Sequence, residues 1–218
     1  MKNIAVIGTG VIGTGWILRF LANGIKVKAF DKNSQQLNFL KDEITRTNLI
    51  IKKLYNTKIN FKNLEIVDNI EKAVKNADLI QENVPERLSL KKDVIKNISK
   101  YSPTNSIIAS SSSGLLPSDL QSKCINPKRL IIAHPFNPVY ILPLVEIVKG
   151  KKTTNLYLNK AKKFYQKIKM KTLLVEKELP GFLSDRLQEA LWREGLHIVN
   201  DGYALSLIHI SEPTRPVP

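Results

Sequence analysis

The sequence predicts an α/β protein with a Rossmann-type, doubly wound and mostly parallel sheet, followed by the start of an all-helical C-terminal domain. Short apolar strands alternate with helical patterns from the first residues onward, which is typical of βαβ units. A glycine-rich turn joins the first strand to the first helix. From Pro180 onward the alternation ends and only a helical pattern continues. We therefore expect the sheet domain over residues 1–179 and the first helix of a second domain over 180–204.

The first half of the chain contains four of the predicted strands. The first helical pattern ends at Asn23-Gly24, a pair that favours helix termination. Ser34 is the expected N-cap of a long, lysine-rich helix that reaches Leu54. We expect strands at 3–8, 25–31, 77–82 and 106–110, and further helices at 11–24, 69–76 and 88–99.

The second half continues the alternation up to the domain boundary. A short helix is expected after Pro117, and Pro180 is expected in the first turn of the last helix, where proline is tolerated. This change of character places the boundary near residue 179. We expect strands at 129–133, 142–148 and 171–176, and a helix at 155–168.

Composition narrows the class of protein. The chain has 218 residues and a formal net charge of +15, which raises the hypothesis of nucleic-acid binding. However, 27 of the 34 basic residues are lysines spread along the whole chain, so we expect no nucleic-acid partner. Apolar runs are too short for a membrane span, which predicts a cytoplasmic protein. Cys124 is the only cysteine, which excludes an intramolecular disulfide and makes a cysteine-based metal site improbable.

The glycine-rich turn has the pattern G-x-G-x-x-G between a predicted strand and a predicted helix. In such a turn the first glycine permits the tight bend, the second lets the backbone approach a pyrophosphate, and the third allows close packing of helix on strand. The pattern therefore predicts a dinucleotide site formed by Gly8, Gly10, Val11, Ile12 and Gly13.

Asp31 ends the second predicted strand, about twenty residues after the glycine turn. A carboxylate there accepts hydrogen bonds from a ribose 2′-hydroxyl and repels a 2′-phosphate, so NAD is favoured over NADP as the cofactor. The alternative is that Asp31 merely begins the turn formed with the next two residues.

Polar residues also follow two later strands. The run Ser110–Ser113 follows the predicted strand at 106–110, and His134 ends the strand at 129–133. Ligands bind at the carboxyl ends of strands in open α/β sheets. If the prolines turn the chain back, Glu146 reaches the histidine ring and fixes its tautomer, so the pair serves as a general base. A polar loop and a structural histidine are the alternatives.

Six separated motifs together resemble the L-3-hydroxyacyl-CoA dehydrogenase superfamily, over residues 1 to about 204. Within that superfamily, the later motifs are most similar to the carnitine dehydrogenases and next to the lambda-crystallin type gulonate dehydrogenases. The motifs are GTGVIG, the acidic Asp31, IQENVPE, SSSSGL, HPFNPVYILPLVE and PGFLSDRL.

This resemblance implies oxidation of a secondary alcohol in a small 3-hydroxy acid, with NAD as the hydride acceptor, in a homodimeric enzyme. It places the catalytic serine at Ser113 and the base pair at His134 and Glu146. The family asparagine falls on Asp185, a departure that favours a substrate carrying a quaternary ammonium, such as L-carnitine, over an acyl-CoA. Glu86 matches a family residue near the nicotinamide.

A trimethylammonium group prefers aromatic faces. The candidates for substrate contact are Phe136, Tyr140, Phe182 and Trp192, although each is equally suited to core packing.

The last segment, LSLIHISEPTRPVP, does not fit this picture. It resembles the translation of a sequencing adapter, so we expect residues 205–218 to be non-native and the natural chain to continue with the rest of the helical domain. A short natural extension is the alternative.

Three functions stay open at this stage. The first is a carnitine dehydrogenase, the second a dehydrogenase for a 3-hydroxyacyl-CoA or L-gulonate, and the third a dinucleotide-binding protein without activity, such as a crystallin-like protein or a redox sensor.

Overall fold

A computed structural model describes residues 1–205 of the chain. The chain divides into two units, Met1–Pro180 and a unit that begins at Gly181, and each is described by itself. The tail that we expect to be non-native lies, apart from Leu205, outside the described residues.

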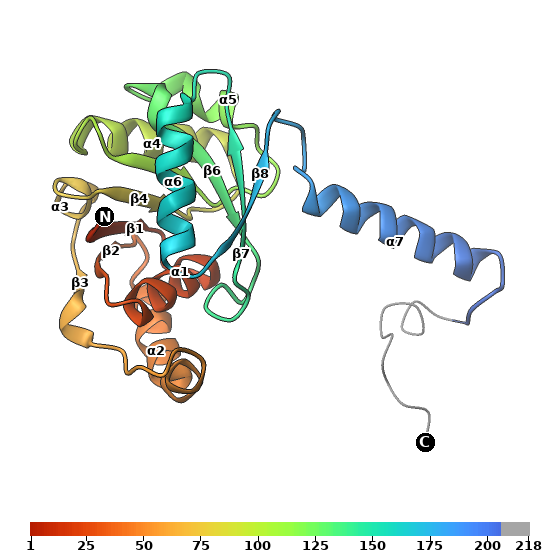
Figure 1. Cartoon of the computed structure of the whole chain (residues 1–218), viewed down its shortest axis with the longest axis horizontal. Helices are drawn as coiled ribbons and strands as arrows, with labels where there is room; N and C mark the ends of the chain where they lie inside the picture. The colour runs from red at the N-terminus through yellow and green to blue at the C-terminus, as the bar shows by residue number, and fades with distance from the viewer. Residues whose placement is uncertain (206–218) are drawn as a thin grey trace. The chain divides into compact units, whose positions relative to one another are not determined.

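The first unit is built on an eight-stranded sheet with the strand order β3-β2-β1-β4-β5-β6-β7-β8 (Figure 1). All neighbouring strands are parallel except β6 and β7, which are antiparallel. The predicted fold class is thereby confirmed. The strands are β1 (Asn3–Ile7), β2 (Lys26–Phe30), β3 (Leu64–Ile66), β4 (Leu79–Glu82), β5 (Ile107–Ser110), β6 (Leu130–Pro135), β7 (Leu144–Lys149) and β8 (Lys171–Val175).

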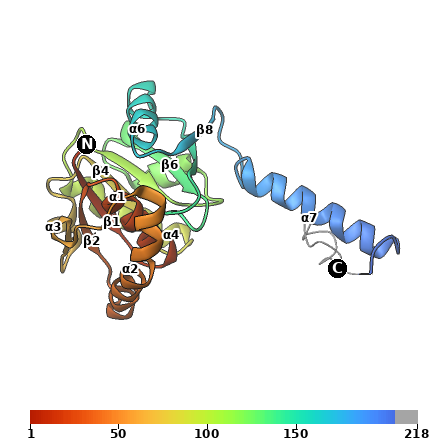
Figure 2. The same cartoon turned by 60° about the horizontal axis from the view of Figure 1, so that its bottom comes forward.

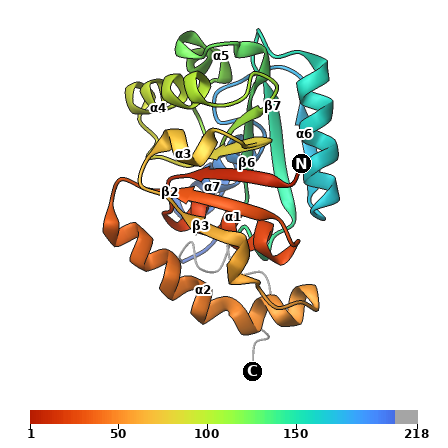
Figure 3. The same ribbon diagram turned by 90° about the vertical axis from the view of Figure 1, so that its left-hand side faces the viewer.

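Helices cover both faces of this sheet. Helices α1, α2 and α6 lie on one face and α3, α4 and α5 on the other (Figures 2 and 3). Their bounds are α1 (Val11–Ala22), α2 (Ser34–Tyr55), α3 (Ile70–Val74), α4 (Leu88–Tyr101), α5 (Pro117–Leu120) and α6 (Asn155–Lys167), with short 3-10 turns at Phe61–Asn63, Gln121–Lys123 and Pro127–Arg129. The second unit contains α7 (Ser184–Asn200).

Two predictions about these elements were wrong, and one strand was missed. The N-cap of α2 is Asn33, because its side chain accepts a hydrogen bond from the Gln35 amide at 2.9 Å, so Ser34 is already helical. Pro180 is not in the first turn of α7, since the left-handed backbone of Gly181 and Phe182 separates it from the helix start at Ser184. The edge strand β3 was not foreseen, because it has only three residues, two of which are exposed.

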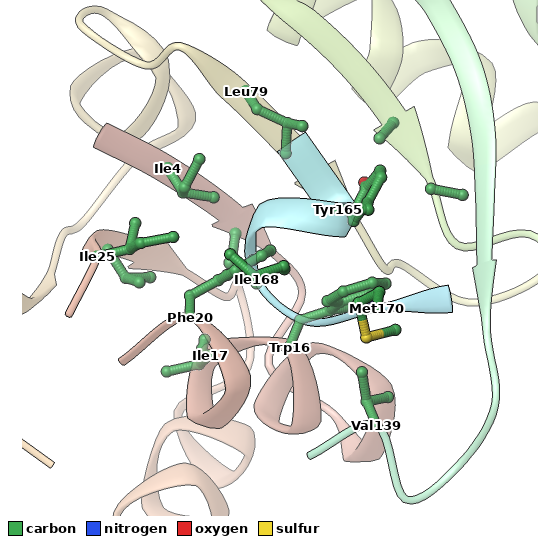
Figure 4. Packing of buried hydrophobic residues seen from close by; sticks show 14 of the residues in the cluster. Ile4, Trp16, Ile17, Phe20, Ile25, Leu79, Val139, Tyr165, Ile168 and Met170 are labelled. Atoms are coloured by element: carbon green, nitrogen blue, oxygen red, sulfur yellow. The ribbon is translucent and has the colours of Figure 1, made fainter. Parts of the chain in front are cut away.

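The main core lies between the sheet and the helices α1 and α6. The Trp16 ring stacks on Phe20 and also contacts Tyr165, with centroids 5.4 Å apart in both pairs (Figure 4). These rings are fully buried, and aromatic burial of this kind is a large part of the hydrophobic stabilisation of a domain. Helix α1 is therefore a rigid support for the glycine turn that precedes it.

Within the described residues, no helix has the length and apolarity that a membrane crossing requires.

Candidate functional site

The glycine turn between β1 and α1 has little room for side chains. Gly8 has a φ of +89°, and a Cβ atom on it would lie 2.8 Å from the Asn83 backbone. A Cβ on Gly13 would lie 1.9 Å from the Gly8 carbonyl oxygen, so helix and turn pack in direct backbone contact. A Cβ on Gly10 would meet only Gln36 Oε1, at 3.6 Å. This is the pattern that a dinucleotide turn needs: Gly8 and Gly13 allow the tight bend and the close packing of the helix, and Gly10 leaves the backbone accessible.

Asp31 follows β2 and touches the same turn. Its Oδ2 accepts hydrogen bonds from the Thr9 amide at 2.6 Å and the Thr9 hydroxyl at 3.2 Å. Its Oδ1 accepts from the Asn33 amide at 2.8 Å, so Asp31 also begins the turn into α2. The carboxylate therefore stabilises the local turn with both of its oxygens.

A pocket of about 360 Å³ opens at the carboxyl ends of β1, β4, β5 and β6. Four of its residues were candidates from the sequence: Ile12, Glu86, Ser113 and His134. The others were missed: Asn83, Val84, Pro85, Lys91, Ser111 and Pro135. The strand-end rule applied to β4 would have identified the segment from Asn83 to Pro85.

His134 and Glu146 meet behind this pocket. They lie opposite each other in the antiparallel register of β6 and β7, with His134 Nδ1 2.9 Å from Glu146 Oε2. Glu146 is fully buried, whereas the His134 side chain is 13% exposed and borders the pocket. Phe136 packs beside the imidazole with ring centroids 5.8 Å apart. An imidazole held in this way by a carboxylate has a fixed orientation and tautomer.

Four serines run from Ser110, the last residue of β5, to Ser113, and the hydroxyls of the first three are engaged in hydrogen bonds. Ser111 is saturated, since it accepts from two neighbours and donates to a third. The contacts are Ser110 to Glu82 Oε2, Ser112 to Glu86 Oε1, and Ser111 to Asn83 Oδ1 with Trp16 Nε1 and Gln81 Nε2 donating to it.

Ser113 differs from its three neighbours. In the part of the chain that the structure describes, its hydroxyl has no hydrogen-bond partner, although its amide donates to Glu86 Oε1 at 3.2 Å. Since Ser113 borders the pocket together with His134, its hydroxyl is available to a ligand there.

A buried ionic cluster supports the other wall. The Lys91 ammonium is 1% exposed and lies 2.9 Å from Glu82 Oε1 and 3.3 Å from Glu86 Oε2. Partial burial acts to raise the pKa of Glu86, but the hydrogen bond from Ser112 and the charge of Lys91 outweigh it and hold this pKa below its usual value. The Glu86 carboxylate is therefore held as an acceptor beside the pocket.

Two further candidates in the first unit lie outside the pocket. Val11 is 57% exposed in the first turn of α1. Tyr140 packs against the main core, and its carbonyl accepts a hydrogen bond from the Tyr55 hydroxyl at 2.9 Å.

The remaining candidates belong to the second unit. Phe182 is fully buried and has a positive φ of 48°. Asp185 and Trp192 lie on one face of α7 together with Gln188 and Glu189 and border a groove there. The acidic and the aromatic candidate of α7 therefore share one face of that helix.

Comparison with known proteins identifies the family of this chain. Residues 3–179 match the family "3-hydroxyacyl-CoA dehydrogenase, NAD binding domain". The chain is 52% identical to an L-carnitine dehydrogenase of Oceanobacillus iheyensis, covering 94% of this chain and 67% of that protein. It is 47% identical to an L-carnitine dehydrogenase of Bacillus cereus, covering 94% of this chain and 63% of that protein.

A solved structure with the same fold is that of FHMPC 5-dehydrogenase, described as an NAD+ dependent dismutase. It superposes with a TM-score of 0.87 at 30% identity, covering 94% of this chain and 67% of that one. The chain thus spans about two thirds of the length of its relatives. It belongs to the 3-hydroxyacyl-CoA dehydrogenase family, and residues 3–179 are its NAD-binding domain.

Proposed function

We propose that the protein oxidises the 3-hydroxyl of L-carnitine to the ketone of 3-dehydrocarnitine, with NAD as the cofactor. The observation that carries this proposal is the His134–Glu146 pair at the wall of a pocket that Ser113 also borders. The carnitine assignment is supported by the similarity to dehydrogenases that bear that name. The next candidates are a 3-hydroxyacyl-CoA or L-gulonate as substrate.

In this mechanism bound NAD supplies the hydride acceptor. The glycine turn and Asp31 would hold its pyrophosphate and ribose, and Glu86 would lie at its nicotinamide end. Nδ1–H of His134 donates a hydrogen bond to Glu146, and Nε2 takes the proton of the substrate hydroxyl, so that an imidazolium forms. Glu146 stabilises the imidazolium that results, since its buried carboxylate bears the opposite charge.

Ser113 orients the reacting oxygen. Its hydroxyl donates a hydrogen bond to that oxygen as negative charge develops there, and it is suited to the role because its three neighbours are engaged. Phe136 keeps one face of the imidazole away from water.

Asp185 attracts the trimethylammonium group of the substrate. A carboxylate at this position is suited to a cation and poorly suited to the phosphates of coenzyme A. Phe136, Tyr140, Phe182 and Trp192 are the candidates for aromatic contact with the same group. We also propose that the protein is a homodimer, in which a partner surface covers Leu187 and Leu191, two leucines of α7 that are each more than half exposed.

The test is NADH formation, followed at 340 nm, with L-carnitine, a 3-hydroxybutyryl-CoA and L-gulonate. Residues 1–204 should be fused to the segment of the Oceanobacillus iheyensis relative that lies beyond the aligned region. The fused protein then has the full length of that relative. We expect the highest kcat/KM with L-carnitine and NAD. A higher kcat/KM with another substrate would overturn the carnitine assignment. NAD binding without turnover of any substrate would overturn catalysis and favour a non-enzymatic, dinucleotide-binding protein.

Cofactor preference provides a second test. Replacing Asp31 by serine removes the carboxylate that favours a free ribose 2′-hydroxyl, so the preference for NAD over NADP should fall by ~10-fold or more, as for a lost hydrogen bond to a charged group. The control is Asp68→Asn, an exposed aspartate that pairs with Lys72. An unchanged ratio of the two dissociation constants in the Asp31 variant would contradict the role of Asp31.

A further inference from the structure

Arg19 is a buried arginine in the last turn of α1. It is 2% exposed, and within the described residues it makes no ion pair. Burial lowers its pKa from the ordinary value, which reflects the cost of placing this charge in the interior. Because a buried charge without an acidic partner is unfavourable, the other contacts of the guanidinium explain its position.

Those contacts are to the carbonyls of two connecting segments. Arg19 Nε donates to the Val139 carbonyl at 2.7 Å, and Nη1 donates to the Ile168 carbonyl at 3.3 Å. The guanidinium also lies over the Tyr55 ring, 5.6 Å from its centroid. Val139 belongs to residues 136–143, the connection between β6 and β7, which we call the hairpin loop.

The hairpin loop joins the strands that carry His134 and Glu146, and it is held against α1 at a second point. A Cβ on Gly15 would lie 2.9 Å from Val139 Cβ, so only glycine allows this approach of helix and loop. Figure 4 shows Val139 beside α1, on the same side as Trp16. The loop is therefore fastened to the helix by one hydrogen bond and by direct packing.

Helix α1 begins at the glycine turn, and its residue Ile12 borders the same pocket as His134. A contact between α1 and the hairpin loop thus links the cofactor side of the pocket to the proton-accepting side. Misplacement of reacting groups by about 1 Å can lower a rate by ~10²-fold.

We propose that Arg19 is a positioning residue: by holding the hairpin loop it fixes both the geometry of the His134–Glu146 pair and the distance of this pair from the dinucleotide turn. The effect on catalysis rests on the proposed function, whereas the effect on the geometry of the pair does not. If Arg19 were purely structural, its replacement would lower the stability of the protein but would change neither turnover nor the geometry of the pair.

The molecule provides a matched control in Arg129. It is fully buried, donates to the carbonyls of Pro103 and Ser99, and likewise makes no ion pair within the described residues. It precedes β6, at the end of the strand opposite to His134. Arg19→Lys and Arg129→Lys remove comparable guanidinium contacts at these two places.

The first measurement is the proton resonance of the imidazole Nδ1–H of His134 in the 218-residue chain. We expect a hydrogen-bonded signal, shifted downfield, in the wild type and in Arg129→Lys, and its loss or broadening in Arg19→Lys. The same signal in all three proteins at equal folded fraction would overturn the proposal. Arg19→Gln, which keeps a donor without the charge, serves if the lysine variant does not fold.

The second measurement is turnover of L-carnitine in the fused protein described above. Arg19→Lys should lower kcat by ~10-fold or more, within the ~10²-fold range of misplaced groups, and should change the KM for NAD less than threefold. Arg129→Lys should change only the unfolding midpoint. If Arg19→Lys loses the resonance but the wild-type fused protein does not turn over L-carnitine, the proposed substrate is rejected and the positioning role is supported.

Discussion

His134 and Glu146 form a pair because β6 and β7 are the one antiparallel neighbour pair of the eight-stranded sheet. In an antiparallel pair, opposed residues have side chains on the same face with Cβ atoms about 4.5–5.5 Å apart, so two residues twelve positions apart in the sequence meet. The parallel strands of the sheet place His134 at the rim with the glycine turn and the serine loop. The hairpin supplies the partner that the rest of the sheet does not.

Replacement of His134 by asparagine should therefore lower kcat by ~10²- to 10⁴-fold, the usual contribution of a general base. Glu146→Gln should lower it by ~10- to 100-fold, since a hydrogen bond to a charged group contributes about 1.5–3 kcal/mol. The dissociation constant for NAD, measured by fluorescence quenching, should change little in both variants. Glu176→Gln is the control, because Glu176 is an exposed glutamate that follows β8 and pairs with Lys149 at the end of β7. Equal turnover in the Glu146 and Glu176 variants would contradict the proposed pair.

The glycine turn makes a prediction about folding. Gly13→Ala places a methyl group 1.9 Å from the Gly8 carbonyl oxygen, so the turn must move. The free energy of unfolding should fall by at least ~1–3 kcal/mol, as in overpacked sites, and NAD binding should weaken with it. Gly114→Ala is the matched control, since a Cβ there meets no atom within 4 Å. Urea denaturation of both variants measures the difference, and equal midpoints would disprove the close contact.

Much of the fold could be predicted because local signals agreed with the global arrangement. The alternation of strands and helices, the glycine turn and the prolines around His134 each have a direct physical meaning in the sequence. The edge strand β3 carried no such signal, because its residues are mostly exposed and its pairing depends on β2.

The site was less predictable than the fold. Which serine of four is free depends on partners such as Glu82 and Trp16, which lie 28 and 95 residues away in the sequence. Lys91 is one lysine of a lysine-rich chain, and only the fold reveals that it is buried between two carboxylates. Long-range hydrogen bonding thus determines the chemistry, and a single sequence does not record it.

Glu86 predicts a dependence of stability on pH. Its pKa is lower in the folded protein than in the unfolded chain, because hydrogen bonding by Ser112 and the charge of Lys91 outweigh the opposing effect of burial. The stabilisation is therefore present above the ordinary value of 4.5 and is lost as the pH falls through the lower folded value. The unfolding midpoint in urea should fall less between pH 6 and pH 3 in Glu86→Gln than in the wild type. The exposed Glu71→Gln should behave as the wild type does, and parallel curves for all three proteins would contradict this prediction.

Replacement of Lys91 should lower the stability of the protein strongly. Its ammonium is 1% exposed beside the fully buried Glu82, which also accepts hydrogen bonds from Ser110 and the Val84 amide. Lys91→Met removes the only cation of this cluster within the described residues, so the free energy of unfolding should fall by about 3–5 kcal/mol, as when one partner of a buried pair is lost. The double variant Glu82→Gln/Lys91→Met should recover part of that loss, because it removes the uncompensated charge. Lys96→Met, on the exposed side of the same helix, is the control. Strict additivity of the two single changes in urea denaturation would show that the two charges do not stabilise each other.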